Sequence, residues 1–324
     1  MKSLTTKSTI TNVLKIALGL LLLYLSFQRV DWQLLLQSLQ SVSVNWLLLA
    51  ILSVLISTTL KILRWDSLLK NYGQQLPTLR LVIAYFLGQA ANILLIIRGG
   101  EIVRITTAHL PGKDDWVEIT ATIALEKYLD LLLLVVLMVT ASVNLPPLAL
   151  EKLGWLSPFL IGLTIGLLLL VIFGPMLWHR LKLPENPSPW LARILRKLDQ
   201  FIQASVWLRD PRKLLPAITL TLLIWVVMAS TNRLVFQSLA LDLGWDAAFL
   251  VLILVYLGVL PALMPGNVGP FTYFAQLALL PFAVNNNLAV AFAVILYVIV
   301  TIPPLLISGI LMLLPNKANR KAIS

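Results

Sequence analysis

Long apolar runs recur along this chain, and they limit its fold more than any other feature of the sequence. A helix needs about 20 predominantly apolar residues to cross the hydrocarbon core of a bilayer. Six segments approach or exceed this length, at residues 11–27, 44–63, 119–143, 155–178, 215–239 and 288–314. They lack the alternation of apolar and polar residues that membrane β-barrel strands show. The sequence therefore predicts an all-α, polytopic membrane protein that forms one integral membrane domain over residues 1–324.

Charged residues are few, and their distribution argues against several functions. Only 12% of the residues are charged, against about 25% in soluble domains. The net charge of +11 comes largely from Lys and Arg in short flanks between apolar runs, where such residues orient a membrane protein, so no nucleic acid partner is expected. The chain has no cysteine, and its two histidines, His109 and His179, are far apart. We therefore expect no disulfide, no metal site and no cofactor.

The longest polar stretch, residues 179–213, carries eight basic residues against three acidic ones. Short basic segments stay on the cytoplasmic side of a membrane. Within it, residues 190–208 have apolar side chains at helical spacing opposite basic ones, which predicts an amphipathic helix lying on anionic lipid. The basic N-terminus, the flank at 61–80 and the C-terminal tail are expected on the same side. These expectations describe a plasma (inner) membrane protein with both termini cytoplasmic and a first apolar run that is retained.

Two further regions, 79–110 and 247–284, each contain an apolar arm, a glycine-bearing break and a shorter second arm. If 79–97 crossed the membrane fully, the basic segment 179–213 would lie outside; a re-entrant hairpin at 79–110 keeps every basic segment inside. For 247–284 this reasoning alone does not decide. The two breaks look alike and would enter from opposite faces, as in an inverted repeat. The fold expected is about six full spans plus two oppositely oriented re-entrant hairpins; an ordinary span at 79–97 and a chance similarity remain alternatives.

The break of the first region carries charged residues at a depth where charges are rare. Five candidates for substrate binding lie here: Arg98, Gly99, Gly100, Glu101 and Arg104. Charges below the headgroups usually face a cavity and mark a substrate path. Helical spacing places Arg98, Glu101 and Arg104 on one side, and guanidinium groups suit phosphate oxygens. The glycine pair permits a tight turn and close approach of the backbone to a ligand.

Three more charged candidates, Glu126, Asp130 and Arg233, lie within apolar runs. Glu126 and Asp130 are four residues apart and share a helix face. They are interpreted either as a proton, cation or ligand site or as ion-pair partners of the arginines in the first break. Arg233 lacks an acidic neighbour in sequence. It either pairs across the bundle with Glu126 or Asp130, contacts an anionic ligand, or extends toward the membrane surface.

The break of the second region is uncharged, and it includes the candidates Pro265, Gly266, Asn267 and Gly269. Backbone amides at the end of a broken helix can bind an anion. A plain break in the helix, with no ligand, is the alternative.

Three motifs in order resemble the lysylphosphatidylglycerol synthase transmembrane region family: Arg98-Gly-Gly-Glu-Ile-Val-Arg104, Glu126-Lys-Tyr-Leu-Asp130 and Pro265-Gly-Asn-Val-Gly-Pro-Phe271. The resemblance spans about residues 11–314, and the family includes the flippase half of the multiple peptide resistance factor. Two positions depart from the family pattern, namely Lys127, where arginine is usual, and Thr272, where an acidic or amide residue is frequent. The resemblance implies lipid handling at the matching residues. No lipid-aminoacylating synthase domain is expected in this chain.

The function expected is that of a flippase-like transporter, which binds and translocates an anionic phospholipid or polyprenyl-linked lipid through a central polar cavity. The chain contains no GxSxG, Walker, HExxH or DxD motif, so no catalytic residue is assigned and no enzyme is expected. One alternative is a membrane-embedded glycosyl- or phospho-transferase that uses the carboxylates as base or metal ligands. Another is a scaffold for a separate transferase. That transferase, or a second copy of the chain, would be its protein partner.

Overall fold

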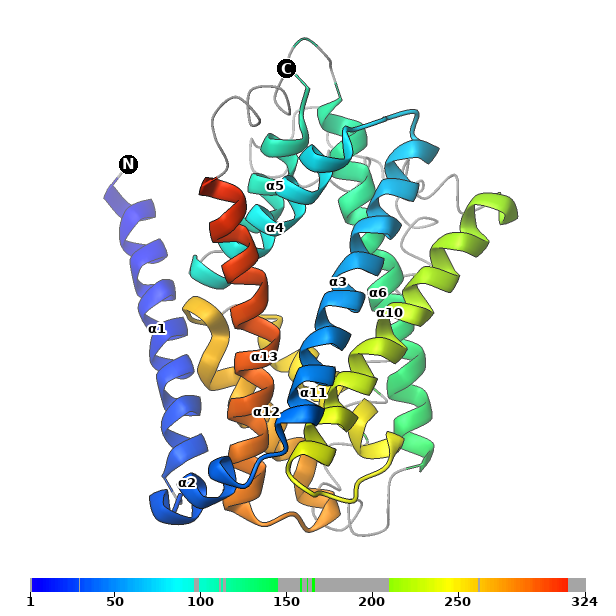
Figure 1. The fold of residues 1–324 in the computed structure, drawn as a ribbon. Helices are drawn as coiled ribbons and strands as arrows, with labels where there is room; N and C mark the ends of the chain where they lie inside the picture. The colour runs from blue at the N-terminus through cyan, green and yellow to red at the C-terminus, as the bar shows by residue number, and fades with distance from the viewer. Residues whose placement is uncertain are drawn as a thin grey trace.

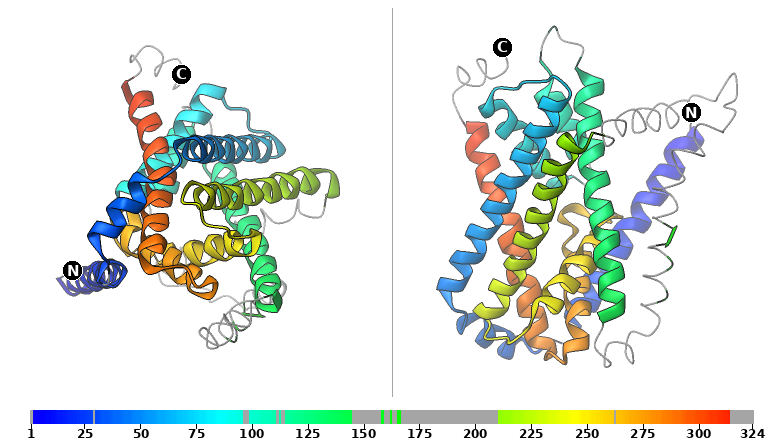
Figure 2. Two further views of the ribbon diagram at one scale, coloured as in Figure 1. Left: turned by 60° about the horizontal axis from the view of Figure 1, so that its bottom comes forward. Right: turned by 90° about the vertical axis from the view of Figure 1, so that its right-hand side faces the viewer.

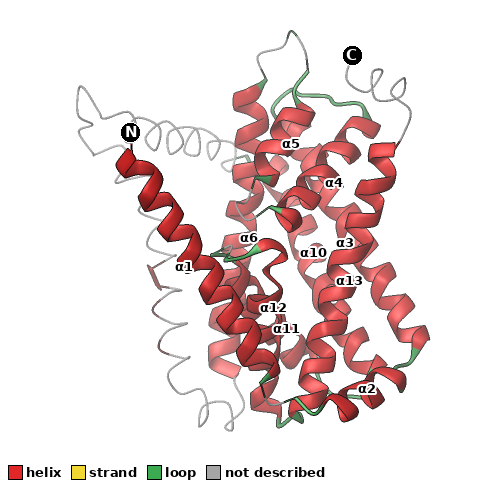
Figure 3. Ribbon diagram, turned by 90° about the vertical axis from the view of Figure 1, so that its left-hand side faces the viewer, coloured by secondary structure: helices red, strands yellow, loops and turns green. Residues whose placement is uncertain are grey.

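The computed structural model describes residues 2–28, 30–95, 99–110, 112, 115–144, 158, 162, 165–166, 210–261 and 263–313. All regular secondary structure in these ranges is helical (Figure 3), which confirms the all-α prediction. The expected span at 155–178 and the amphipathic helix at 190–208 lie outside the described residues, apart from four isolated positions in the former.

Five long helices correspond to five of the six predicted spans. They are α1 (Lys2–Phe27), α3 (Val44–Asn71), α6 (Trp116–Asn144), α10 (Pro211–Ser238) and α13 (Asn286–Leu313). The short helices are α2 (Trp32–Gln40), α4 (Thr78–Leu94), α5 (Gly100–Ala108), α11 (Trp245–Val259) and α12 (Val268–Leu279), with 3₁₀ turns at Pro265–Asn267 and Leu280–Phe282. In Figure 1, α1 begins and α13 ends at the upper end of the bundle.

Three described helices are long and apolar enough to cross a membrane: Val44–Asn71, Arg212–Ser238 and Asn286–Leu313. A fourth span results if Val13–Phe27 and α2, which meet at an angle of 81°, are counted as one broken helix. At 29 residues, α6 is as long as these helices, but it carries four charged residues between positions 118 and 130. The chain is therefore a multi-pass membrane protein.

The two regions with glycine-bearing breaks each form a pair of short helices. In Figure 1, α4 and α5 lie toward the upper end of the bundle, whereas α11 and α12 lie toward the lower end. The members of each pair pack against each other, and the 3₁₀ turn between α11 and α12 contacts α4. The breaks of the two pairs therefore approach each other inside the bundle.

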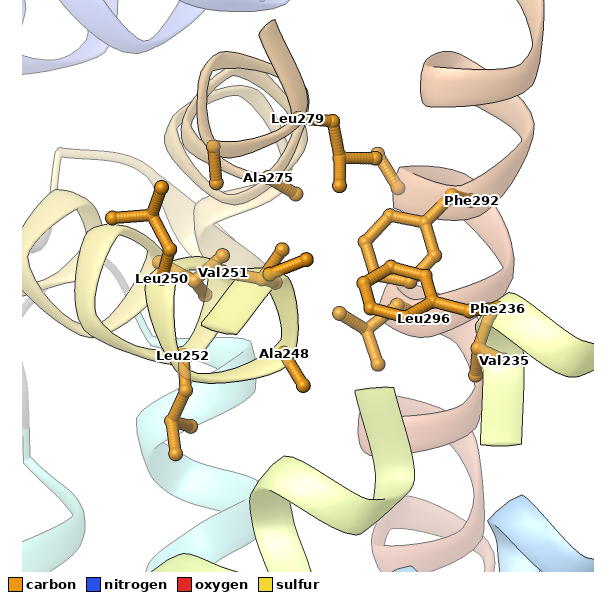
Figure 4. Close-up of a cluster of buried hydrophobic side chains, with 14 of the residues drawn as sticks. Val235, Phe236, Ala248, Leu250, Val251, Leu252, Ala275, Leu279, Phe292 and Leu296 are labelled. Carbon is orange, nitrogen blue, oxygen red and sulfur yellow. The ribbon is translucent and has the colours of Figure 1, made fainter. Parts of the chain in front are cut away.

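The largest buried apolar cluster lies mainly on α10, α11, α12 and α13 (Figure 4), and it extends to residues of α2, α3 and α6. Phe236 of α10 and Phe292 of α13 lie with their ring centroids 4.7 Å apart, and the fully buried Ala248 and Ala275 let the neighbouring helices approach closely. Because lipid tails are as apolar as these side chains, tight packing rather than water exclusion holds such a cluster together.

Polar side chains join α3 to α10, which run side by side (Figure 2). The Ser53 hydroxyl donates to the carbonyl oxygen of Val227 over 3.0 Å and lies 2.9 Å from the Thr231 hydroxyl. The Asn232 amide donates to the carbonyl oxygen of Ala248 on α11 over 2.8 Å. Each such bond between membrane helices contributes about 0.6 kcal/mol. Together they fix the register of three helices.

Substitution of Gly100 tests the crossing of α4 and α5. A Cβ at Gly100 would overlap the carbonyl oxygen of Gly88 and the side chain of Asn92. We expect Gly100→Ala to lower the free energy of unfolding by about 1–3 kcal/mol through overpacking. Gly309→Ala in α13 is the matched control, because nothing lies within 4 Å of its added Cβ. Thermal unfolding in detergent should show a lower midpoint for Gly100→Ala only; equal midpoints would contradict the crossing.

Candidate functional site

Arg64 lies at the centre of a buried network of charges. The helix α3 continues to Asn71, eight residues beyond the predicted end of its apolar run, and it carries Arg64 into the bundle. The guanidinium binds both carboxylate oxygens of Asp130 on α6, with distances of 2.7 Å and 3.1 Å. It also donates to the Thr221 hydroxyl of α10 over 2.9 Å. With 3% of its surface exposed, Arg64 connects three helices.

Glu126 extends this network to α5. One of its carboxylate oxygens lies 2.7 Å from a terminal nitrogen of Arg104, and the other lies 3.8 Å from Nε of Arg64. The guanidinium of Arg104 lies over the Trp65 ring, 3.8 Å from its centroid, and 4.9 Å from the Tyr85 ring centroid. Within this network each guanidinium thus faces a carboxylate, and two aromatic faces hold Arg104 in place.

Two arginines of the flank at 61–80 are not surface charges, contrary to the expectation from sequence. Arg64 belongs to the buried network, and Arg80 is equally buried. Arg80 donates to the backbone carbonyl oxygens of Thr107 and His109, and so ties the start of α4 to the end of α5. Only Lys70, paired with Asp66 at 2.5 Å, behaves as an exposed flank charge with its partner on the same helix.

Three adjoining cavities occupy the centre of the bundle. The charged cavity has a volume of about 150 Å³ and is lined by Lys61, Arg64, Arg104, Glu126, Lys127 and Asp130, together with aromatic and apolar side chains. The apolar cavity, of about 200 Å³, is lined mostly by apolar side chains, chiefly from α11 and α13, and also by Lys61, two amide side chains and three Ser or Thr side chains. The third, or tip cavity, has about 310 Å³. Tyr256 of α11 lines all three, which shows that they are neighbours.

The structure brings most of the candidates from the first break together. Arg104 joins Glu126 in the network, and Glu101 lies 3.5 Å from the ammonium of Lys127 on α6. Gly99 caps α5. The Gly100 amide donates to the Asn92 side chain over 3.0 Å, so this glycine serves the close contact of α5 with α4. Arg98 lies outside the described residues.

The second break lines the tip cavity through Gly266 and Asn267. Both adopt positive φ angles, 66° and 49°, where glycine and asparagine are favoured. The Asn267 side chain accepts a hydrogen bond from the Leu263 amide over 3.1 Å. This bond closes the turn around the 3₁₀ segment Pro265–Asn267. Gly269 instead packs against the backbone of α1 near Gly19, where a Cβ would not fit.

Arg233 does not join this network, so of the three alternatives for this residue the structure does not show the pairing with Glu126 or Asp130. The two carboxylates are bound by Arg64 and Arg104, whereas the guanidinium of Arg233 lies over the Trp245 ring, 5.1 Å from its centroid. The indole N–H of Trp225 on α10 donates to Asp130 over 3.3 Å, so the network meets α10 at this residue. Arg233 lies eight residues further on, about 12 Å along the helix.

Several residues of the site were not among the sequence candidates. They are Lys61, Arg64, Tyr85, Gln89, Asn92, Lys127 and Tyr256. The spacing of Lys61 and Arg64 did contain a signal, because residues three apart share a helix face and Trp65 follows immediately. Among the described residues, no group of three His, Asp or Glu side chains could hold a metal ion. The carboxylates of the network serve instead as partners of arginines.

Comparison with known proteins identifies a family that the chain matches. The sequence model of the family described as "Lysylphosphatidylglycerol synthase TM region" matches residues 12–308. No curated protein matches the chain.

Substitution of Glu126 tests the network. Glu126→Gln leaves Arg104 buried without an anion, so we expect the free energy of unfolding to fall by about 3–5 kcal/mol. The matched control is Asp66→Asn, which removes the exposed pair with Lys70 and should change the free energy by about 1 kcal/mol or less. The two variants are compared by thermal unfolding in detergent. Equal shifts of their midpoints would mean that the buried pair adds no more stability than the exposed one.

Proposed function

Because the chain belongs to the lysylphosphatidylglycerol synthase TM region family, we propose that it binds an anionic phospholipid or polyprenyl-linked lipid and translocates it across the membrane through the three central cavities. The observation that carries this proposal is a charged cavity inside an otherwise apolar helical bundle. Ionisable groups at membrane depth are expensive, and they persist where they line a path for water or a charged substrate.

The three cavities together match the chemistry of a lipid. The charged cavity presents Lys and Arg side chains, which bind phosphate oxygens. The apolar cavity next to it has a predominantly apolar lining, which suits the hydrocarbon part of the same molecule. A lipid is the substrate class that needs both surroundings within one molecule. Transport requires no covalent step, and the carboxylates that a transferase would need as base or metal ligands are held by arginines.

The two helix pairs support a transport path. We propose that α4–α5 and α11–α12 are re-entrant hairpins of opposite orientation, related as an inverted repeat. They lie toward opposite ends of the bundle in Figure 1, and residues of both breaks line the tip cavity: Asn92 and Glu101 from the first, Gly266 and Asn267 from the second. Broken helices that meet at mid-depth are typical of binding sites in transporters that alternate between two open states.

Blocking the cavities tests the transport proposal. Val300 of α13 lines both the apolar cavity and the tip cavity, so Val300→Trp should fill the path and abolish translocation. The matched control is Val298→Trp on the same helix, because Val298 is 47% exposed on the outside of the bundle. Each protein is reconstituted in vesicles, and the transfer of a fluorescent phosphatidylglycerol between leaflets is followed by quenching of the outer leaflet.

Wild type and the control should accelerate transfer over protein-free vesicles, and Val300→Trp should not. A wild-type protein without acceleration would refute translocation, and an active Val300→Trp of normal thermal stability would refute the path.

Single-cysteine labelling tests the re-entrant hairpins directly, because the chain has no native cysteine. Gln75 and Val117, which flank the α4–α5 pair, are both exposed, as are Asp242 and Asn285, which flank the α11–α12 pair. We expect a membrane-impermeant maleimide added to intact cells to label Asp242→Cys and Asn285→Cys. Gln75→Cys and Val117→Cys should react only after the membrane is opened. Labelling of one member of a pair without the other would show that the pair crosses the membrane.

A further inference from the structure

Lys61 differs from every other charged residue of the central cavities. It lies one helical turn before Arg64 on α3, and its side chain lines both the charged cavity and the apolar cavity. Among the described residues it has no ion-pair or hydrogen-bond partner. The charges that surround it are those of Asp130, Arg64, Lys127 and Glu126. Lys61 thus places an ammonium at the junction of two chemically different cavities.

The other described charges of the cavities form pairs. Arg64 pairs with Asp130, Arg104 with Glu126 and Lys127 with Glu101. These three pairs contain three cations and three anions, and Lys61 is the cation that remains. The site, as far as the structure describes it, therefore carries one unmatched positive charge.

An unmatched ammonium inside a membrane bundle is unfavourable, because the surroundings replace little of its lost hydration. A leucine or methionine would fill the same position without this penalty. The position therefore indicates a ligand that supplies one negative charge and also occupies the apolar cavity. We propose that Lys61 binds the phosphate of a lipid phosphodiester, with the adjoining hydrocarbon in the apolar cavity; this inference rests on the proposed function and narrows its substrate class.

The charge of the site discriminates between lipid phosphates. A phosphodiester carries a single negative charge, which Lys61 neutralises. A pyrophosphate or a doubly ionised phosphomonoester would bring a second charge with no partner among the described residues, since the arginines are already bound by carboxylates. We therefore expect the site to prefer the diester over these more highly charged ligands. A cavity that attracted anions only through a general positive charge would show the opposite preference.

The test uses purified full-length protein and native mass spectrometry of lipids retained from mixed micelles. The micelles contain equal amounts of phosphatidylglycerol, phosphatidic acid and phosphatidylcholine. Wild type should retain phosphatidylglycerol in preference to phosphatidic acid, a phosphomonoester, and to phosphatidylcholine, a diester whose own choline neutralises the phosphate. Lys61→Met should reduce this occupancy about tenfold or more, the loss of one charge-assisted hydrogen bond, whereas Lys61→Arg should keep it. Lys70→Met, which removes an exposed lysine of the same helix, is the matched control and should bind as wild type does.

Two further measurements separate the alternatives. Lys61→Met should unfold at the same or a higher temperature than wild type, because it removes an unmatched charge; a lower midpoint would mean that Lys61 is structural. Excess glycerophosphoglycerol, a soluble phosphodiester without acyl chains, should not displace the lipid. Displacement would show a site for free phosphate esters and would overturn the role of the apolar cavity.

Other outcomes also contradict the inference. Unchanged phosphatidylglycerol retention in Lys61→Met, or equal retention of phosphatidic acid in wild type, would overturn it. Either result leaves the proposed function intact if wild type still translocates lipid in vesicles. Specific retention that depends on Lys61, without any translocation, would instead refute the proposed function and leave the binding site in place.

Discussion

The contact of Arg64 with both oxygens of Asp130 determines how the charged half of the bundle is arranged. It holds α3 against α6, and the bond to Thr221 adds α10 to the same point. Glu126, one turn away from Asp130, can then receive Arg104 and with it α5. Without Arg64, Asp130 would lose its arginine partner inside the bundle, while Glu126 would keep Arg104. The shape and charge of the cavities follow from this one neutralised cluster.

Much of the architecture could be predicted because long apolar runs in a membrane protein form helices that lie within the bilayer. The run at 119–143 became Trp116–Asn144, and the two glycine-bearing breaks became pairs of short helices. Arg64 could not be placed, since hydropathy alone does not distinguish a basic residue at a helix end from one inside the bundle. The partner of Arg233, likewise, depends on its height along α10 relative to α6, which no local pattern specifies.

The second break shows how one position can depart from a family pattern without loss of structure. Thr272 stands where an acidic or amide residue is frequent. Its hydroxyl is buried, donates to the Val268 carbonyl oxygen over 2.8 Å and lies 3.2 Å from the Ser26 hydroxyl of α1. A short neutral side chain therefore joins α12 to α1 at a point where a carboxylate would need a cation. The described charged side chains of the site all come from the α4–α5 pair, α3 and α6.

The glycine crossing of α4 and α5 has a mechanical consequence. Gly88 and Gly100 bring the two backbones so close that neither helix can slide past the other, and Arg80 bonds the outer ends together. The two helices thus form one rigid unit. A displacement of α4 or α5 away from α6 therefore has to involve both helices together, and it would break the pairs Arg104–Glu126 and Glu101–Lys127.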